Sequence, residues 1–191
     1  MNHHHQEGGQ STLAEGCGVA GRVGFYEETG AFGDVIQNHL FQVLTNLAME
    51  ATVSTDSESI RDEKVKVLKA MAPLEEKNLV RGQFRGYRGE KGVAPGSEVE
   101  TYAAMRLDIE SKRWQGVPFY LRAGKCLPAT YTEVVVRLHR AATLYQDLLL
   151  KPNAFRFRIS PEIVFAVGMN VLGANEQKPG QSVEMVACRQ Q

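Results

Sequence analysis

The sequence has few of the features that mark a secreted or membrane-spanning protein. Its 191 residues include three cysteines, far apart at Cys17, Cys126 and Cys188 and without CxxC spacing, so we expect reduced thiols and no disulfide framework. No stretch approaches the roughly eighteen apolar residues of a membrane span, and no apolar segment near the start is typical of a signal peptide. We therefore expect a soluble, cytoplasmic protein with no membrane partner.

An excess of charge of either sign is also missing. Lys plus Arg number 22 and Asp plus Glu number 22, so the formal net charge is zero. A chain balanced in this way creates no overall field that would attract nucleic acid or an anionic membrane, and we expect neither as a partner. The hydrophobic content of 43% is enough to build a folded core, which excludes a disordered chain.

The first residues, "MNHHHQEGGQST", are polar and rich in glycine. The histidines at 3–5 could bind a metal, but a tag-like terminus is the simpler interpretation, and we assign no metal site to them. The expected organisation is a disordered or tag-like segment over residues 1–12, followed by one domain over residues 13–191.

Two helices are expected in the first half of that domain. Over residues 36–47, apolar side chains recur at intervals of four, three and four residues, which is the pattern of an amphipathic helix. The segment "DSESIRDEKVKVLKAM" offers Asp56 or Ser57 as a capping residue, is acidic at its start and has lysines near its end. Pro73 ends this second helix.

After Pro73 the pattern changes to alternation and to β-branched and aromatic residues, which predicts strands. Helical patterns do not separate these strands regularly, so βαβ crossovers are not expected. The predicted fold class is α+β, with a large, mostly antiparallel or mixed sheet and helices packed on one face. The last segment becomes apolar at Val183, as if a further element were cut short. The expected strands are "NLVRGQFRGY", "TYAAMRLDIE", "VPFYLRAG", "YTEVVVRLHR", "NAFRFRIS" and "EIVFAVGMNV".

Side chains that could carry chemistry gather in three short segments. "DVIQNHL" contains Asp34, Asn38 and His39, "FYLRAGKCL" contains Lys125 just after a strand, and "AEGCGVAGRVGFYEE" contains Glu15. Taken one at a time, these residues have ordinary structural interpretations. Asp34 would be an acidic residue stabilised by the helix dipole, His39 a half-buried core histidine, and the other two solvated charges.

Taken together, "GRVGFYEETGAFGDVIQNHLFQVLTNLAME", "RDEKVKVLKAM", "GVPFYLRAGKCL" and "TEVVVRLHR" resemble, in order and spacing, the C-terminal β+α domain of the glucose-6-phosphate dehydrogenases. The resemblance runs from about Leu13 to at least Val171. It implies oxidation of glucose 6-phosphate, or a related sugar phosphate, to the lactone, with hydride transfer to NADP. The family's Gly-rich nucleotide-binding segment is not among these residues, so the isolated fragment is expected to be inactive.

The resemblance also implies a role for each candidate residue. His39, in the D-x-x-Q-N-H motif, corresponds to the family's catalytic base, which takes the proton of the sugar C1 hydroxyl as hydride leaves C1. Asp34 and Glu15 would contact sugar hydroxyls. Lys125 corresponds to the lysine that binds the phosphorylated substrate, where a cation forms strong charge-assisted bonds. Asn38 would support the helix end, outside the site.

Two positions depart from the family pattern, and one alternative function stays open. Gly33 stands where arginine is common, and Thr130 stands where some members have lysine or arginine, which weakens any second phosphate cation. Family members associate through the outer face of the sheet, which implies a homo-oligomer. The alternative is a non-catalytic oligomerisation or interaction module that retains the fold, favoured by an exposed apolar sheet face. A metal site is not supported, because no second histidine lies three or four residues from His39.

Overall fold

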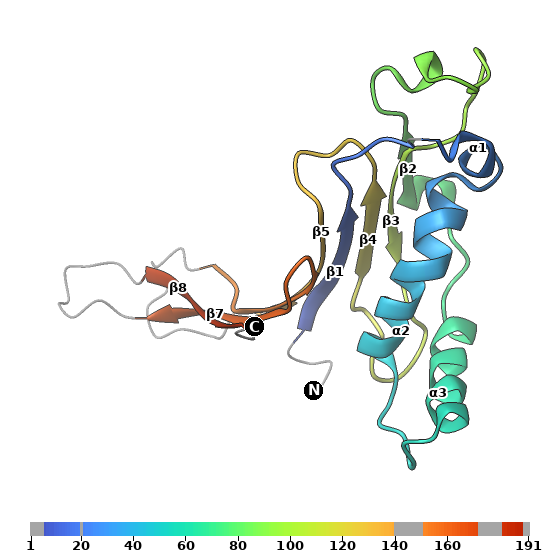
Figure 1. Cartoon of the computed structure of the whole chain (residues 1–191). Coiled ribbons are helices and arrows are strands. Elements are labelled where there is room, and N and C mark those ends of the chain that lie inside the picture. Colours follow the sequence, from blue (N-terminus) through green and yellow to red (C-terminus); the bar gives the residue numbers. More distant parts are fainter. Residues whose placement is uncertain (1–5, 20, 140–150, 172–180, 189–191) are drawn as a thin grey trace.

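The computed structural model describes residues 6–19, 21–139, 151–171 and 181–188, in which eight strands form one sheet of order β2-β3-β4-β1-β5-β6-β7-β8. Helices lie against one face of the first strands of this order, and β7 and β8 extend away from them as an arm (Figure 1). The predicted α+β class is confirmed. The strands are β1 Gln6–Ala14, β2 Leu79–Gly82, β3 Tyr102–Leu107, β4 Phe119–Gly124, β5 Tyr131–Leu138, β6 Ala154–Ser160, β7 Val164–Val171 and β8 Gln181–Cys188.

The sheet is mixed, because one pair of neighbouring strands is parallel. β1 runs parallel to β4 and antiparallel to β5, whereas the other neighbouring strands pair antiparallel. Each of the six predicted strand segments contains a strand, although the first ends already at Gly82. The segment that becomes apolar at Val183 is β8, which pairs with β7 along its whole length.

The helical part is a nearly continuous run followed by one separate helix. α1 (Val23–Ala31), the π-helix η2 (Phe32–Leu40) and α2 (Phe41–Ala48) follow one another, and α3 covers Ser57–Lys69. The helix predicted over 36–47 is confirmed, but its first half is a π-helix, with i→i+5 hydrogen bonds.

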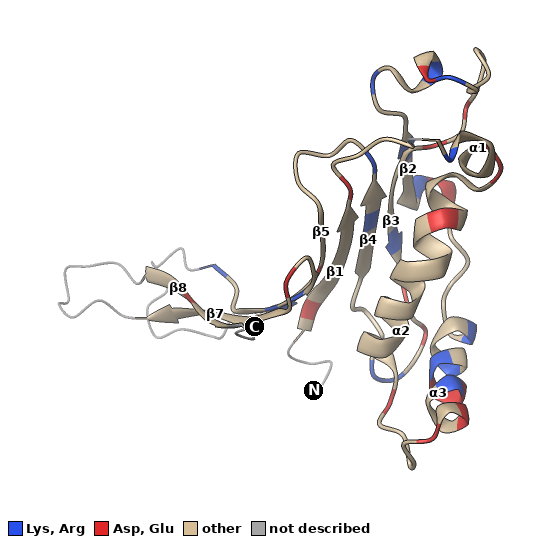
Figure 2. Ribbon diagram, in the orientation of Figure 1, with Lys and Arg blue, Asp and Glu red and all other residues tan. Residues whose placement is uncertain are grey.

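The capping residue predicted for α3 is confirmed. The Asp56 carboxylate accepts a hydrogen bond from the Ser59 backbone N–H at 2.9 Å. That bond satisfies one of the free donors at the helix start. Acidic and basic side chains are interspersed along α3 (Figure 2), as expected for a helix with one solvated face.

The main core lies between the helices and β3, β4 and β1. Leu40 and Leu44 are fully buried against it, and the Trp114 indole N–H donates to the Ala48 carbonyl at 2.7 Å. That bond ties the segment before β4 to the end of α2. The buried members of this core are Ala31, Val35, Ile36, Leu40, Leu44, Ala48, Val67, Ala103, Met105, Leu107, Ile109, Trp114, Val117, Phe119, Leu121 and Ala123.

The interpretation of residues 1–12 as a disordered or tag-like terminus is wrong for residues 6–12. These residues belong to β1, which lies between β4 and β5 in the middle of the sheet. Gly9 explains why the segment looked unstructured, because a Cβ there would lie 3.1 Å from the Phe119 ring. Glycine at this position therefore allows a close approach of the Phe119 ring, which composition alone does not show. The histidines at 3–5 lie outside the described residues.

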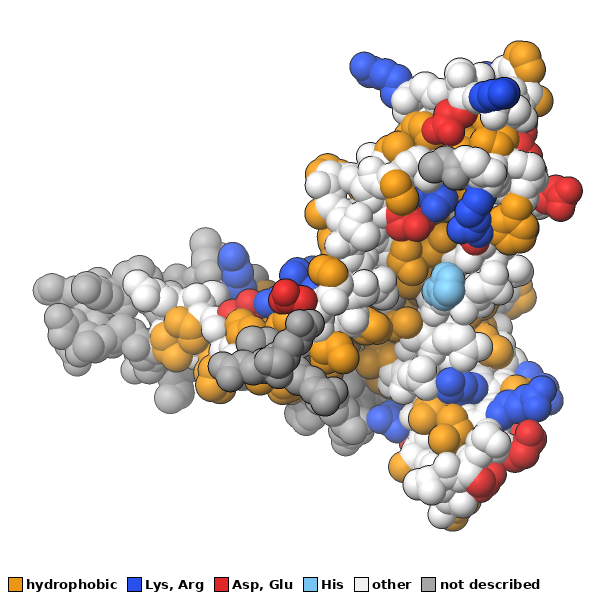
Figure 3. Space-filling model, viewed as in Figure 1, with side chains coloured by type: hydrophobic (Ala, Val, Ile, Leu, Met, Phe, Trp, Pro, Cys, Tyr) orange, Lys and Arg blue, Asp and Glu red, His pale blue; other side chains and the backbone are white. Residues whose placement is uncertain are grey.

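The apolar face of the sheet continues beyond the helices. Gly9 faces Leu47 of α2, and register places Val136, Phe155 and Met185 on the same side as Gly9. Exposed apolar side chains lie on the arm in Figure 3. Among the described residues, several large hydrophobic side chains on β6–β8 and in the turn between β6 and β7 are exposed. They are Phe157, Ile159, Ile163, Phe165, Val171, Val183, Met185 and Val186.

A second, smaller core lies under the segment 84–99. This glycine-rich segment is a loop with a short 3-10 turn over Tyr87–Gly89, and it buries Tyr87 and Val93 against α1. Val19, Val23 and Tyr26 complete the buried cluster. In the part of the chain that the structure describes, no helix is long and apolar enough to cross a membrane.

The junction of α1 and η2 depends on Gly30 and Glu100. Gly30 has φ 58° and ψ −168°, a conformation that essentially only glycine adopts. A Cβ at this position would collide with the Glu100 carboxylate. That carboxylate accepts a hydrogen bond from the Phe32 N–H at 3.1 Å, and the Glu100 carbonyl accepts one from the Ala31 N–H at 3.0 Å. Glu100 thus caps the start of the helix that carries Asp34.

Gly30→Ala should lower the free energy of unfolding by about 3 kcal/mol, from backbone strain and from loss of the Glu100 cap. The matched control is Gly24→Ala, because a Cβ at Gly24 meets nothing within 4 Å and Gly24 lies inside α1. This control should leave stability unchanged or raise it by up to about 1 kcal/mol. Urea unfolding followed by circular dichroism measures both, and equal effects of the two changes would contradict the account of the junction.

Candidate functional site

Glu15 and Lys125 meet because β1 and β4 are parallel. Ala14 is paired with Gly124 at the carboxyl ends of the two strands, and the next residue of each chain segment is Glu15 or Lys125. The Glu15 N–H donates to the Gly124 carbonyl at 3.0 Å, which continues the pairing past the strand ends. The Lys125 ammonium then donates to Glu15 Oε2 at 2.7 Å.

Lys125 is enclosed to an unusual degree for a lysine. Its side chain is 5% exposed, against 28% for Glu15. The ammonium lies 5.3 Å from the centroid of the Tyr26 ring, within the range of a cation–π interaction. A buried cation must be compensated, and Glu15 and the Tyr26 ring supply the compensation here.

Tyr26 connects this pair to the helix. Its side chain is buried, and its hydroxyl has no hydrogen-bond partner among the described residues. Burial raises the pKa of Tyr26, and the negative charges of Asp34, Glu100 and Glu15 raise it further. The phenol therefore stays protonated and neutral, close to three carboxylates.

Asp34 lies at the start of η2 and forms an ion pair with Arg22. Arg22 Nη2 donates to Asp34 Oδ1 at 3.1 Å, with the aspartate side chain 13% and the arginine side chain 61% exposed. Asn38 Nδ2 lies 3.5 Å from the Asp34 carbonyl, a long contact within the helix. This contact is consistent with Asn38 as a support for the helix end.

His39 is exposed on η2 and forms no hydrogen bond or ion pair with any described residue. The interpretation as a half-buried core histidine therefore does not fit. In an α-helix, residues five apart point in different directions, but the i→i+5 bonding of a π-helix brings them toward one face. A π-helix therefore places residues five apart, such as Asp34 and His39, closer in direction around the axis than an α-helix would.

The loop after Lys125 is held by Thr130. The Thr130 hydroxyl accepts a hydrogen bond from the Gly16 N–H at 2.8 Å, so this side chain fastens the segment that follows Glu15. Cys17 and Cys126 are free thiols, and the Cys126 N–H donates to the Cys17 carbonyl at 3.1 Å. Within the described ranges, no group of three His, Cys, Asp or Glu side chains could hold a metal ion.

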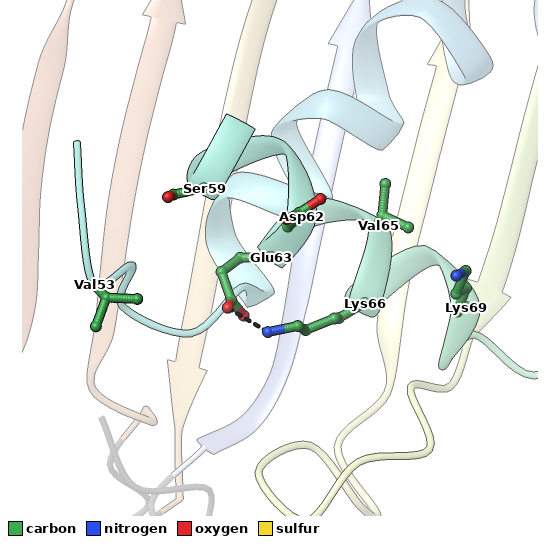
Figure 4. Close-up of a pocket in the computed structure, with 7 residues that line it drawn as sticks. All are labelled: Val53, Ser59, Asp62, Glu63, Val65, Lys66 and Lys69. Atoms are coloured by element: carbon green, nitrogen blue, oxygen red, sulfur yellow. Dashed lines mark hydrogen bonds and ion pairs between the residues drawn. The ribbon is translucent and has the colours of Figure 1, made fainter. Parts of the chain in front are cut away.

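A hollow of about 340 Å³ lies elsewhere, along α3. Its walls include Asp62 and Lys69, and Figure 4 shows the Glu63 carboxylate turned to the Lys66 ammonium. The two charges pair with each other at 2.5 Å. We assign the hollow no role, because its charged side chains lie along one solvated helix.

The structure therefore groups three of the four predicted site residues. Glu15 pairs with Lys125, whose ammonium lies over the Tyr26 ring, and the charge of Asp34 helps to raise the pKa of Tyr26. His39 lies five residues after Asp34 on the same π-helix. Sequence reasoning missed Tyr26, together with Arg22 and Glu100, which position Asp34 and its helix. Arg22 and Tyr26 both lie in the quoted segment "GRVGFYEE", but nothing in the letters indicates which of them faces Lys125.

A family model described as "Glucose-6-phosphate dehydrogenase, C-terminal domain" matches residues 1–191. This chain belongs to that family. Glucose-6-phosphate 1-dehydrogenase 1 of Mycobacterium tuberculosis strain H37Rv is 46% identical over 154 residues, which are 79% of this chain and 33% of the relative. The cytoplasmic isoform of the Solanum tuberosum enzyme is 38% identical over 178 residues, which are 93% of this chain and 34% of the relative.

A solved structure agrees with the family. "Glucose-6-phosphate dehydrogenase in complex with its substrate glucose-6-phosphate" is 35% identical, with a TM-score of 0.89, over 98% of this chain and 40% of that chain. The chain thus spans about a third of the length of the curated relatives it matches. The resemblance in the sequence segments is confirmed, and its extent is larger than residues 13–171.

The Glu15–Lys125 pair predicts unequal effects of two neutral substitutions. Glu15→Gln leaves the enclosed ammonium of Lys125 without a counter-charge and should cost about 3 kcal/mol of unfolding free energy. Arg22→Gln breaks a pair whose arginine is 61% exposed and should cost less than about 1 kcal/mol. Urea midpoints of both variants test this difference. A Glu15→Gln variant as stable as Arg22→Gln would mean that Lys125 is not enclosed as described.

Proposed function

We propose that the chain is the substrate-binding and catalytic-base domain of an NADP-dependent glucose-6-phosphate dehydrogenase. The observation that carries the proposal is the Glu15–Lys125 pair at the ends of two parallel strands, beside the Tyr26 ring and near enough to Asp34 for its charge to raise the pKa of Tyr26. A cation flanked by carboxylates suits a sugar phosphate, because the phosphate needs a charged donor and the hydroxyls need acceptors. The relatives, all named as dehydrogenases, do not favour the alternative of a non-catalytic interaction module.

The proposed roles follow from the chemistry of each side chain. His39 takes the proton of the C1 hydroxyl while hydride leaves C1, which requires an exposed and unengaged ring such as this one. Asp34 and Glu15 accept hydrogen bonds from sugar hydroxyls. Lys125 keeps further ammonium protons beyond the one donated to Glu15, and the substrate would accept them at the small part of this side chain that is exposed.

NADP, when bound, supplies the hydride acceptor, and we assign none of the described residues to it. We also propose a cytoplasmic location, supported by the similarity to the cytoplasmic isoform of the Solanum tuberosum enzyme. A homo-oligomer through the sheet is proposed as well. Its support is the exposed apolar surface on β6–β8, and the molar mass in solution is the measurement that decides it.

These 191 residues alone should bind glucose 6-phosphate but should not produce NADPH, since binding needs only the Glu15, Lys125 and Asp34 cluster. Calorimetry would measure binding, and absorbance would follow NADPH. Lys125→Met should abolish the binding heat, with Lys112→Met as the control because Lys112 is exposed and outside the cluster. Equal binding by the wild type and Lys125→Met would refute the proposed site.

His39→Asn separates a base from a structural residue. In a chimera that joins these residues to the remaining part of a relative, this change should lower kcat by about 10²–10⁴-fold with little change in KM. The thermal midpoint should stay near that of the parent chimera, because His39 is exposed. The control is Gln37→Asn, at an exposed position two residues before His39, which should leave kcat unchanged. A His39→Asn chimera with normal turnover would remove His39 from the mechanism.

A further inference from the structure

We propose that Tyr26 is a positioning residue, whose aromatic ring holds the Lys125 ammonium in place for a sugar phosphate. The inference deepens the proposed function and rests on it. Lys125 has a long, flexible side chain, which has to keep one position beside the carboxyl end of β4 to bind a ligand. The Glu15 carboxylate anchors one proton of the ammonium at 2.7 Å, and the ring centroid of Tyr26 lies 5.3 Å from the same nitrogen.

The ring, not the hydroxyl, is the part of Tyr26 that serves the site. The hydroxyl is buried and has no hydrogen-bond partner among the described residues, so a ligand cannot contact it without displacing protein atoms. Leaving a donor unpaired in this way is costly. A tyrosine at this position therefore contributes to Lys125 through the face of its ring, which attracts a cation electrostatically.

The second core makes Tyr26 rigid enough for this role. Tyr87 packs edge-to-face against Tyr26, with ring centroids 6.3 Å apart, and Phe84 packs edge-to-face against Tyr87 at 5.4 Å. The Tyr87 hydroxyl donates to Glu27 Oε1 at 2.5 Å, and Ser97 donates to the same oxygen at 2.8 Å. These bonds lower the pKa of Glu27, which stays charged and keeps accepting from Tyr87. The loop over α1 thus supports Tyr26, and Tyr26 supports Lys125.

The experiment compares ring loss with hydroxyl loss. Tyr26→Leu should weaken the affinity of the chain for glucose 6-phosphate by about five- to tenfold, whereas Tyr26→Phe should stay within about twofold of the wild type. An equal loss of affinity in Tyr26→Leu and Tyr26→Phe would assign the effect to the hydroxyl and not to the ring, and would overturn the proposal.

A second measurement does not depend on the ligand. In a chain labelled with ¹³C-lysine, the Lys125 Hε resonance, assigned by its disappearance in Lys125→Met, should be shifted upfield by the Tyr26 ring. Tyr26→Phe should retain this shift, and Tyr26→Leu should abolish it. Unchanged Hε shifts in Tyr26→Leu would overturn the proposal. If the wild type does not bind glucose 6-phosphate, the proposed function fails, while these shifts still decide whether the ring holds Lys125.

Pentafluorophenylalanine at position 26 covers the case in which Tyr26→Leu does not fold. This residue has the shape of phenylalanine but a ring whose face no longer attracts a cation. It should weaken glucose 6-phosphate affinity about as much as Tyr26→Leu, although the fold, followed by amide NMR spectra, is retained. Affinity equal to that of Tyr26→Phe would exclude the cation–π contribution.

Discussion

The parallel pairing of β1 with β4 is the constraint on which the arrangement of the site depends. Glu15 and Lys125 are separated by more than half of the chain. They become neighbours because the carboxyl ends of two adjacent parallel strands lie side by side. The hydrogen bond from the Glu15 N–H to the Gly124 carbonyl extends this pairing by one residue. An antiparallel pairing would have placed the two side chains at opposite ends of the strands.

The π-helix η2 carries the remaining candidate residues, Asp34 and His39. Gly30 and Glu100 set the junction where the chain leaves α1, and the π-helix that follows carries both Asp34 and His39. π-helical turns are less stable than α-helical ones and occur often at functional sites. The uncommon backbone conformation at Gly30 and the π-helix therefore lie together, next to Asp34.

Two separate hydrophobic cores support different parts of the site. The larger core fixes the helices on β3, β4 and β1, and the smaller one fixes Tyr26 under the loop 84–99. Beyond β5 the same sheet face stays apolar, but among the described residues no helix covers it on β6–β8. An exposed apolar face of this kind is typical of a contact surface.

Local patterns in the sequence were sufficient for the α+β class, for most strands, for the Asp56 cap and, through family resemblance, for Glu15, Asp34, His39 and Lys125 as candidates. These features depend on neighbours in the chain or on short motifs. The sequence did not show that residues 6–12 form a central strand, because the close packing of Gly9 against the Phe119 ring of β4 joins segments far apart in the chain. Only the tertiary structure decided that Tyr26 faces Lys125, since this contact joins residues 99 positions apart by way of strand order, helix kink and loop packing.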